Sequence, residues 1–257
     1  MKTKAEIVEN WLPRYTGLEL DQFGEYIILV NFSDYVEAFA EMHDVVVEGR
    51  NRSMISATSG GITIINFGMG SANAATIMDL LTAIRVKACL FLGKCGGLRS
   101  DKNKVGDLIL PIAAVRGEGA SDDYFPPEVP ALPSFALQKA ISTTIRDYRQ
   151  DYWTGTVYTT NRRVWEFDKE FKEYLMAIRC LAIDMETATL FSVGFHNKIS
   201  SGALLLVSDI PMLPEGVKTT ESDKKVTRRF VDNHLQIGID SLKQLINNAQ
   251  TVRHLKF

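Results

Sequence analysis

Three acidic side chains follow directly after two apolar runs in the carboxyl-terminal third of the sequence. Residues 181–183 lead into Asp184 and Glu186, and residues 203–207 lead, through one serine, into Asp209. Such runs are typical of buried strands, and ligands of open α/β sheets bind beyond the carboxyl ends of the strands. Two acids delivered there can divide the chemistry, one holding a substrate and the other transferring a proton.

Structural roles for the same acids stay open at this point. Asp184 is placed to cap the helix that is expected to follow, and Glu186 would favour the positive end of its dipole. Asp209 would start a turn. Taken singly, each acid is more often structural than catalytic, so a catalytic interpretation needs support from the rest of the chain.

The composition is that of a globular protein without a strong charge bias. Of the 257 residues 46% are hydrophobic, and 29 basic against 31 acidic side chains leave a net charge of −2. This balance argues against a general nucleic-acid or membrane-surface binder. No apolar run approaches a membrane span and the amino end lacks the apolar core of a signal peptide, so we expect a cytoplasmic protein.

Cysteine and histidine give no sign of a metal site. The cysteines Cys89, Cys95 and Cys180 form no CxxC pair, and an odd number without a secretory signal indicates reduced thiols. The four histidines show no metal-ligand spacing. We therefore expect no metal, no cofactor and no Ser-His-Asp triad.

Strand and helix patterns alternate along the chain, which favours an α/β fold. Apolar, β-rich runs predict core strands over residues 26–30 and 88–92. The longest helix is predicted over 225–249, and the polar stretch 219–229 is predicted to be a mobile flap. Because no linker or repeat interrupts the pattern, residues 1–257 are predicted to form a single domain.

Two glycine-rich segments follow predicted strands. The segment GMGSAN at 68–73 opens a helix, where free backbone N–H groups can bind an anion or another ligand. It is not a complete GxGxxG motif, so it is a weak dinucleotide signal and equally compatible with a tight turn. The segment GKCGG at 93–97 carries Lys94, which needs either a buried partner or a route to solvent.

Six motifs occur in a fixed order along the chain, namely GMGSANAA, FLGKCGGL, VGDLILPIAAVRGEGAS, TGTVYTT, DMETATLF and LLLVSDIP. The series resembles the nucleoside phosphorylase and hydrolase superfamily from about residue 26 to residue 247. The resemblance implies a three-layer α/β/α fold around a central mixed twisted sheet. GTVYTTNRRVWE and RRFVDNHLQIGIDSL are similar in particular to the catalytic domain of nucleosidases that act on AMP. The long bacterial members carry an extra amino-terminal domain, so we expect this chain to be a short form.

The resemblance also implies roles for the acids. Met185 and Glu186 would line the ribose, whose 2′,3′-diol offers two O–H donors to a carboxylate. Asp209 would act on N7 of a purine, and partial burial would raise its pKa so that it can donate a proton to the leaving base. The floor near the base and sugar would be formed by Ser208, Gly70, Ser71 and Gly96.

The chain departs from the phosphorylases of this superfamily where they bind inorganic phosphate. Residues 31–35 replace their Gly-Asp-Pro-x-Arg segment, and Phe91 and Lys94 stand in place of the arginine and threonine of Arg-x-Gly-Thr. Water is therefore the simpler nucleophile. Asp34 and Glu37 lie nearby, but neither matches the water-activating glutamate of related nucleosidases, so the base is left unassigned.

A 5′-phosphate on the substrate requires positive charge and hydrogen-bond donors. The candidates are Lys94, Arg50, Arg52, Arg162 and Arg163, and for each a solvent-exposed charge is the alternative. Arg50 and Arg52 would act on the site of a neighbouring subunit, because similar members share sites across dimers.

We therefore expect a cytoplasmic purine-salvage enzyme that hydrolyses AMP to adenine and ribose 5-phosphate. It would be a dimer-based homo-oligomer such as a hexamer and would bind neither nucleic acid nor membranes. The alternatives are a purine nucleoside phosphorylase, another purine nucleosidase, or a non-catalytic purine-nucleotide sensor. The missing arginines argue against phosphorolysis, and the presence of both Glu186 and Asp209 argues against a sensor.

Overall fold

Eight strands form one mixed sheet in the computed structural model, which describes residues 2–247. The strands are β1 Tyr26–Val30, β2 Ile55–Ser59, β3 Ile62–Asn66, β4 Ala88–Gly97, β5 Leu108–Gly117, β6 Trp153–Thr160, β7 Ala182–Asp184 and β8 Ser201–Asp209. Their order is β2-β3-β1-β4-β7-β6-β5-β8, and β4 pairs in addition with β8. Both strands predicted from apolar runs are present, although β4 is longer than expected.

Part of this sheet closes on itself. β4 runs parallel to β8, and β8 runs antiparallel to β5. β5 is parallel to β6, β6 is parallel to β7, and β7 returns antiparallel to the end of β4. These five strands make a closed ring, and β1, β3 and β2 extend the sheet outward from β4. The pairing brings the ends of β4, β7 and β8 together.

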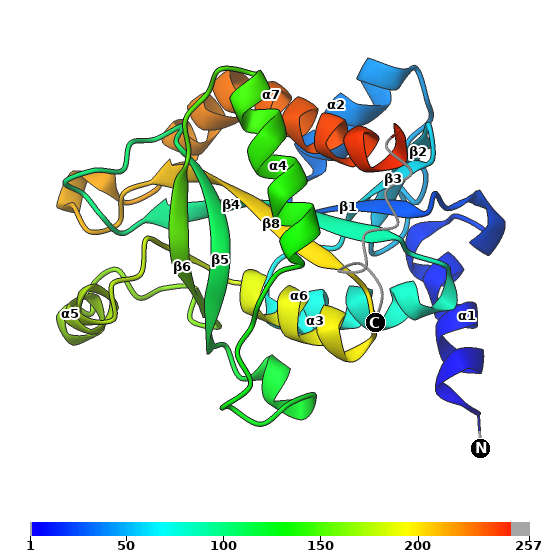
Figure 1. Cartoon of the computed structure of the whole chain (residues 1–257), viewed down its shortest axis with the longest axis horizontal. Coiled ribbons are helices and arrows are strands. Elements are labelled where there is room, and N and C mark those ends of the chain that lie inside the picture. Colours follow the sequence, from blue (N-terminus) through cyan, green and yellow to red (C-terminus); the bar gives the residue numbers. More distant parts are fainter. Residues whose placement is uncertain (1, 248–257) are drawn as a thin grey trace.

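Helices cover both faces of the sheet. They are α1 Lys4–Thr16, α2 Ser33–His43, α3 Ser71–Leu80, α4 Phe135–Asp147, α5 Lys169–Ala177, α6 Thr187–His196 and α7 Thr220–Asn247. Figure 1 shows α2, α4 and α7 on one side and α1, α3 and α6 on the other. Along β1, Ile28 and Val30 pack toward the first group while Ile27 and Leu29 pack toward the second, as strand alternation requires. The structure confirms the expected three-layer α/β/α arrangement.

β4 does not end at residue 92, so the prediction that the glycine-rich segment 93–97 follows the end of this strand is wrong. The strand continues to Gly97 and is buried throughout. A β-carbon on Gly93 would lie 2.4 Å from the ring of Phe91, and one on Gly97 would lie 3.0 Å from the side chain of Asn103. These glycines therefore allow close packing around a continuous strand instead of a change of direction.

The polar stretch 219–229 was predicted as a mobile flap, but its residues 220–229 are helical and form the start of α7. The Thr219 hydroxyl accepts the backbone N–H of Ser222 at 3.1 Å and so caps the first turn. Further along, buried Val231 and Leu235 pack toward the sheet. The predicted end of this helix at residue 249 lies outside the described residues. No helix within residues 2–247 has the length and apolar character that a membrane crossing needs.

Candidate active site

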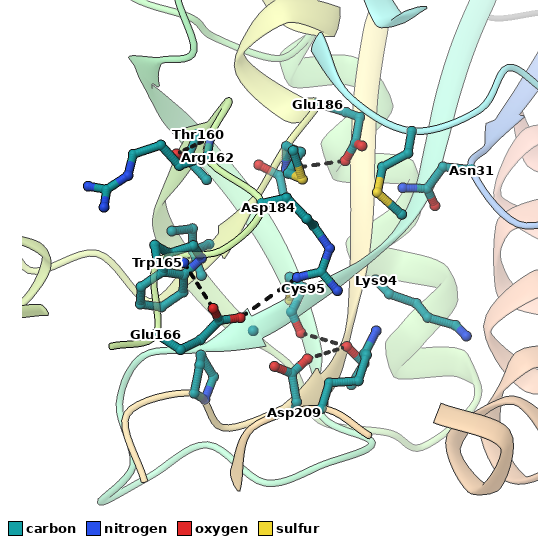
Figure 2. A pocket seen from close by; sticks show the side chains of 18 of the residues that line it. Asn31, Lys94, Cys95, Thr160, Arg162, Trp165, Glu166, Asp184, Glu186 and Asp209 are labelled. Atoms are coloured by element: carbon teal, nitrogen blue, oxygen red, sulfur yellow. Dashed lines mark hydrogen bonds and ion pairs between the residues drawn. The ribbon is translucent and has the colours of Figure 1, made fainter. Parts of the chain in front are cut away.

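A pocket opens where five strands end, and Figure 2 shows the side chains around it. Asn31 follows β1, Thr160 ends β6, Asp184 ends β7 and Asp209 ends β8. The carboxyl-terminal part of β4 forms another wall through Lys94 to Gly96. The full lining is Asn31, Phe32, Met69, Lys94, Cys95, Gly96, Thr160, Arg162, Arg163, Trp165, Glu166, Ile183, Asp184, Met185, Glu186, Ser208, Asp209, Pro211 and Lys218.

Gly96 lies between the two strands that carry the acids. It pairs with Ile183 of β7 on one side and with Asp209 of β8 on the other. A β-carbon at this position would come within 2.8 Å of Pro211 Cγ. The sheet thus brings Asp209 and the segment leading to Glu186 to opposite flanks of one residue that has no side chain.

Glu186 is buried and accepts hydrogen bonds on both oxygens. Its Oε1 accepts the backbone N–H of Gly70 at 2.7 Å, its Oε2 accepts that of Met185 at 3.2 Å, and the Asn31 side chain also hydrogen-bonds it. Gly70 has φ of 94°, which favours glycine at this turn. Burial, and then the charge of Asp184, raise the pKa of Glu186 to about 7. Near neutral pH this carboxyl therefore changes charge easily.

Asp184 also reaches the pocket, but its oxygens are already used. Oδ1 accepts the hydroxyl of Thr159 at 2.7 Å, and Oδ2 accepts the N–H of Thr187 at 2.8 Å as well as its hydroxyl. The N–H belongs to the first turn of α6, so the carboxylate caps that helix as the capping alternative proposed. Asp184 thus joins β6, β7 and α6.

Asp209 is the acid with the environment of a proton donor. Burial raises its pKa above the ordinary range for aspartate, while the Ser208 hydroxyl, which donates to Oδ1 at 2.6 Å, opposes that rise. Ser208 Oγ also lies 3.2 Å from the Cys95 carbonyl oxygen, a second acceptor for its single proton. The arrangement favours a carboxyl group that can be protonated when a base is bound.

Lys94 has a buried partner and does not reach solvent. Its side chain is only 2% exposed, and its Nζ donates to Asp223 Oδ1 at 3.0 Å and to Thr227 Oγ1 at 2.9 Å. The ammonium also lies 4.3 Å from the centroid of the Phe32 ring. Burial lowers the pKa of Lys94, and Asp223 works against that effect. Both partners on α7 come from the stretch expected to be a flap.

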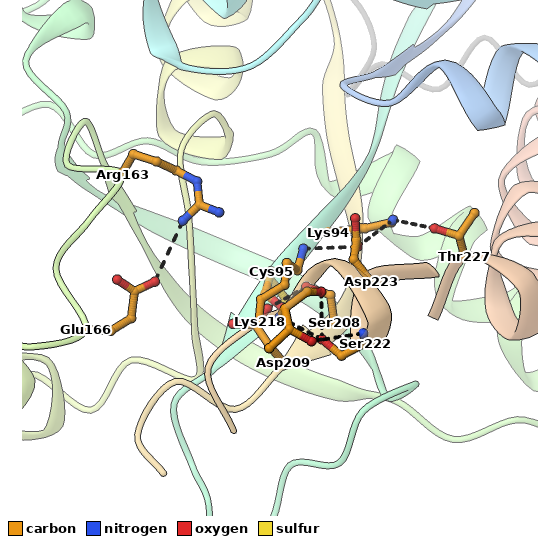
Figure 3. A network of polar contacts seen from close by, with 11 residues as sticks. Lys94, Cys95, Arg163, Glu166, Ser208, Asp209, Lys218, Ser222, Asp223 and Thr227 are labelled. Atoms are coloured by element: carbon orange, nitrogen blue, oxygen red, sulfur yellow. Dashed lines mark hydrogen bonds and ion pairs between the residues drawn. The ribbon is translucent and has the colours of Figure 1, made fainter. Parts of the chain in front are cut away.

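Lys218 is a pocket residue that the sequence interpretation missed. Its Nζ lies 3.3 Å from the same Asp223 oxygen that Lys94 contacts, as Figure 3 shows, and 5.7 Å from the Phe32 ring centroid. It follows β8 by a short connection containing Pro214–Gly216. Its only sequence signal was its position shortly after Asp209, in a segment with no motif of its own.

The four arginine candidates for phosphate binding divide into two pairs. Arg162 and Arg163 line the pocket, where Arg162 contacts Asp168 at 2.8 Å and Arg163 lies 3.7 Å from Glu166. Arg50 and Arg52 do not line it. The Arg50 guanidinium is paired with Glu37 at 2.7 Å on the surface. A role for the second pair stays a prediction that concerns the site of another subunit.

Aromatic and acidic side chains complete the rim near Asp209. Trp165 is buried, lines the pocket and packs edge-on against Phe171 at 5.6 Å between ring centroids. Its backbone N–H donates to Glu166 Oε2 at 2.9 Å. The sequence interpretation singled out neither Asn31 nor Glu166 as a site residue, because both reach the pocket from loops without a spacing pattern.

The remaining predicted residues lie at or next to the pocket. Met185 and Ser208 line it, whereas Gly70 contributes its N–H to Glu186, and Ser71 is buried at the start of α3. Within residues 2–247 no three His, Cys, Asp or Glu side chains are grouped to hold a metal ion. The described pocket therefore combines an acid of raised pKa, a hydrogen-bonded carboxylate and a paired cation, which suits proton transfer and recognition of hydroxyl groups.

Comparison with known proteins gives two informative relatives. The chain is 35% identical over 281 aligned residues to the AMP nucleosidase of Escherichia coli, covering 91% of this chain and 57% of that protein. It thus spans little more than half the length of this curated relative. It is also 57% identical to the crystal structure of an AMP nucleosidase from Bacteroides thetaiotaomicron, with a TM-score of 0.86, covering 96% of this chain and all of that one.

A more distant protein shares the fold, and a sequence model of a whole family identifies the family. A uridine phosphorylase structure from Vibrio fischeri has a TM-score of 0.78 at 23% identity, covering 88% of this chain and 95% of its own, a likeness of fold alone. The sequence model described as the phosphorylase superfamily matches residues 25–246. That match includes all eight strands and nearly all of α7, so the chain belongs to the phosphorylase superfamily.

Proposed function

We propose that the chain is a nucleosidase that hydrolyses the N-glycosidic bond of AMP to adenine and ribose 5-phosphate. The observation that carries the proposal is that Glu186 and Asp209 line one pocket, where Gly96 pairs with Ile183 of β7 on one side and with Asp209 on the other. The similarity to AMP nucleosidases from two bacteria supports the choice of substrate. The departures at Asn31, Phe91 and Lys94 support water as the nucleophile.

Asp209 acts as the general acid. Cleavage of the C1′–N9 bond sends an electron pair to the purine, which becomes a better leaving group when N7 accepts a proton. The raised pKa of Asp209, which burial causes, increases the protonated fraction near neutral pH. Because the carboxyl is attached to the end of β8 beside Gly96, its position is fixed by the sheet.

Glu186 holds the ribose. An ionised carboxylate accepts both hydroxyls of a 2′,3′-diol, and Met185 supplies an apolar contact next to it. The N–H groups of Gly70 and Met185 fix the direction of the carboxylate before substrate arrives. Its negative charge also stabilises the positive charge that develops on the sugar in the transition state.

Arg163 is the pocket cation that is most available to the 5′-phosphate. Its side chain is 58% exposed, and its ion pair with Glu166 is long at 3.7 Å. Arg162 is held more firmly by Asp168 and lies 5.1 Å over the Phe171 ring, so we give it a supporting role. Arg50 and Arg52 would reach the site of an adjacent subunit in a dimer-based homo-oligomer.

The chain is further proposed to act as one catalytic domain in a cytoplasmic purine-salvage reaction. Two observations support one domain. The family model matches residues 25–246, and the hydrophobic clusters on the two faces pack against the same sheet. Gel filtration with light scattering measures the oligomer directly.

Incubation of the purified chain with AMP, with and without inorganic phosphate, tests the reaction. Chromatography should show adenine and ribose 5-phosphate at a rate that does not require phosphate. Replacement Asp209→Asn keeps size and removes the proton, so kcat should fall by about 10²–10⁴-fold. Asp232→Asn, an exposed position on α7 outside the pocket, is the matched control. Binding of AMP without any release of adenine would instead indicate a nucleotide sensor, and phosphate-dependent release would indicate a phosphorylase.

A further inference from the structure

Three charged groups from distant parts of the chain meet beside the pocket, and two of them, Lys94 and Lys218, line it (Figure 3). Asp223, in the first turns of α7, receives Lys94 at 3.0 Å and Lys218 at 3.3 Å on the same oxygen. Lys94 is almost fully buried, whereas Lys218 keeps about a fifth of its side chain in solvent. The buried lysine therefore depends on Asp223 for its counter-charge, while solvent screens Lys218.

This cluster is on the side from which a nucleophile must approach C1′. In a β-nucleotide the base lies on one face of the ribose and the 2′- and 3′-hydroxyls lie on the other. An attacking group opposite the base thus approaches beside the residue that holds the diol. If Glu186 holds the diol, as the proposed function requires, the attacker lies near Asn31, which hydrogen-bonds Glu186. Asn31, Phe32 and Lys94 line this part of the pocket together.

A buried ammonium beside the path of attack would attract an anionic nucleophile such as inorganic phosphate. Asp223 already occupies that ammonium, and a second anion there would meet a like charge. We propose that Asp223 is a specificity-determining residue that excludes inorganic phosphate from the nucleophile's side of the pocket. Water, which carries no charge, is not excluded in this way.

Asn31 has an acceptor on this side of the pocket that no described group uses. Its Oδ1 is buried and has no hydrogen-bond partner in the described part of the chain, while its side chain is tied to Glu186. In Figure 2 the carbonyl oxygen of this side chain points away from Glu186.

The alternative is that Asp223 only anchors α7. The helix start is capped independently, since the Thr219 hydroxyl accepts the N–H of Ser222, so replacement of the Asp223 charge leaves the cap in place. Glu221 lies in the same first turn, is paired with Lys225 at 2.9 Å and is 81% exposed. Glu221→Gln thus removes the same charge from the same helix terminus without touching the pocket.

Titration calorimetry with inorganic phosphate, in the absence of nucleotide, tests the proposal. Asp223→Asn should bind phosphate at least about tenfold more tightly than the unchanged protein and Glu221→Gln. The double replacement Lys94→Met with Asp223→Asn should lose the gain. Asp223→Ser, which also suits a helix start, provides a second variant should the first be unstable. Equal phosphate affinity in all folded variants would overturn the proposal.

Product analysis gives a second readout with phosphate present. In Asp223→Asn a phosphate oxygen would form a bond to C1′ as the C1′–N9 bond breaks, and the electron pair would leave with the purine, which takes the proton of Asp209. AMP would then yield ribose 1,5-bisphosphate beside ribose 5-phosphate. The binding result depends only on Lys94 and Asp223, so it stands or fails separately from the proposed AMP hydrolysis. Tighter phosphate binding that the Lys94→Met replacement does not abolish would also contradict the assignment.

Discussion

The hydroxyl of Ser208 is predicted to set the upper pH limit of activity. It donates to Asp209 Oδ1 at 2.6 Å, a length typical of an O–H donor facing a charged oxygen. That bond favours the ionised carboxylate and so lowers the pKa of Asp209 against the effect of burial. Catalysis by a general acid needs the protonated form, so the rate is full below this pKa and falls above it. Ser208→Ala removes the bond and should therefore move the alkaline limb upward.

The size of the shift follows from the contact that is lost. A hydrogen bond to a charged group contributes about 1.5–3 kcal/mol, and one pKa unit corresponds to about 1.4 kcal/mol. Loss of the Ser208 hydroxyl should therefore raise the pKa of Asp209 by about one to two units. The Cys95 carbonyl oxygen, 3.2 Å from Ser208 Oγ, competes for the same proton and favours the lower end of this range.

The assay is kcat for AMP hydrolysis between pH 5 and 10, with adenine quantified by chromatography. Ser192→Ala is the matched control, because the Ser192 hydroxyl is buried on α6 with no hydrogen-bond partner among the described residues. Its alkaline limb should coincide with that of the unchanged protein. A limb that stays in place or moves to lower pH in Ser208→Ala would refute the assignment of Asp209 as the acid.

Two further predictions follow from shifted pKa values. Burial and Asp184 raise the pKa of Glu186 to about 7, and the ribose needs the ionised form, so kcat/KM for AMP should fall as pH decreases below 7. Glu186→Gln should remove this acid limb and lower kcat/KM by about 10–100-fold, the equivalent of one charged hydrogen bond; an unchanged limb would exclude Glu186 as its source. Burial lowers the pKa of His234 to about 4, so the neutral ring stabilises the fold above pH 6.5, and this contribution is lost as pH falls from 6.5 to 4. Urea unfolding should show a loss of about 3 kcal/mol over that interval, reduced in His234→Gln; equal losses in both proteins would contradict the linkage.

The core and the two principal acids were predictable from sequence because their signals are local. The apolar runs before Glu186 and Asp209 became β7 and β8, and the run at 26–30 became β1. A strand end fixes where its last side chain lies, so an acid there is placed by the sheet itself. The roles of these acids came from resemblance, because local patterns alone left capping and catalysis as alternatives. For Asp184 the structure shows the capping role, because its carboxylate accepts the first N–H of α6.

The length of β4 was not predictable, because glycine has two opposite uses. In an isolated sequence Gly93, Gly96 and Gly97 indicate a turn. In the fold, a β-carbon would lie 2.4 Å from Phe91 at Gly93, 2.8 Å from Pro211 at Gly96 and 3.0 Å from Asn103 at Gly97. Each glycine therefore allows a close approach within a strand that continues and pairs with β8 and β7. These approaches depend on the folded arrangement, which a sequence pattern does not reveal.

The partners of Lys94 could not be predicted from the local sequence either. Its partner Asp223 is 129 residues away along the chain and was read as part of a polar flap, since the first turns of α7 bury little apolar surface. Lys218 and Asn31 reach the pocket from connections whose composition is ordinary. A lysine at a buried position predicts a partner, as charge burial requires, but cannot say which acid supplies it.

The departures from the phosphorylase pattern acquire one physical explanation in this structure. Taken one at a time, the changes around Asn31 and at Lys94 indicate only that residues which bind phosphate in phosphorylases are missing. Together with Asp223 they form a cluster in which the ammonium of Lys94 is already paired with a carboxylate of α7. A buried lysine without that carboxylate would lack its counter-charge and would attract phosphate. The choice of nucleophile would therefore depend on a helix that contributes neither the sugar-holding carboxylate nor the proton donor.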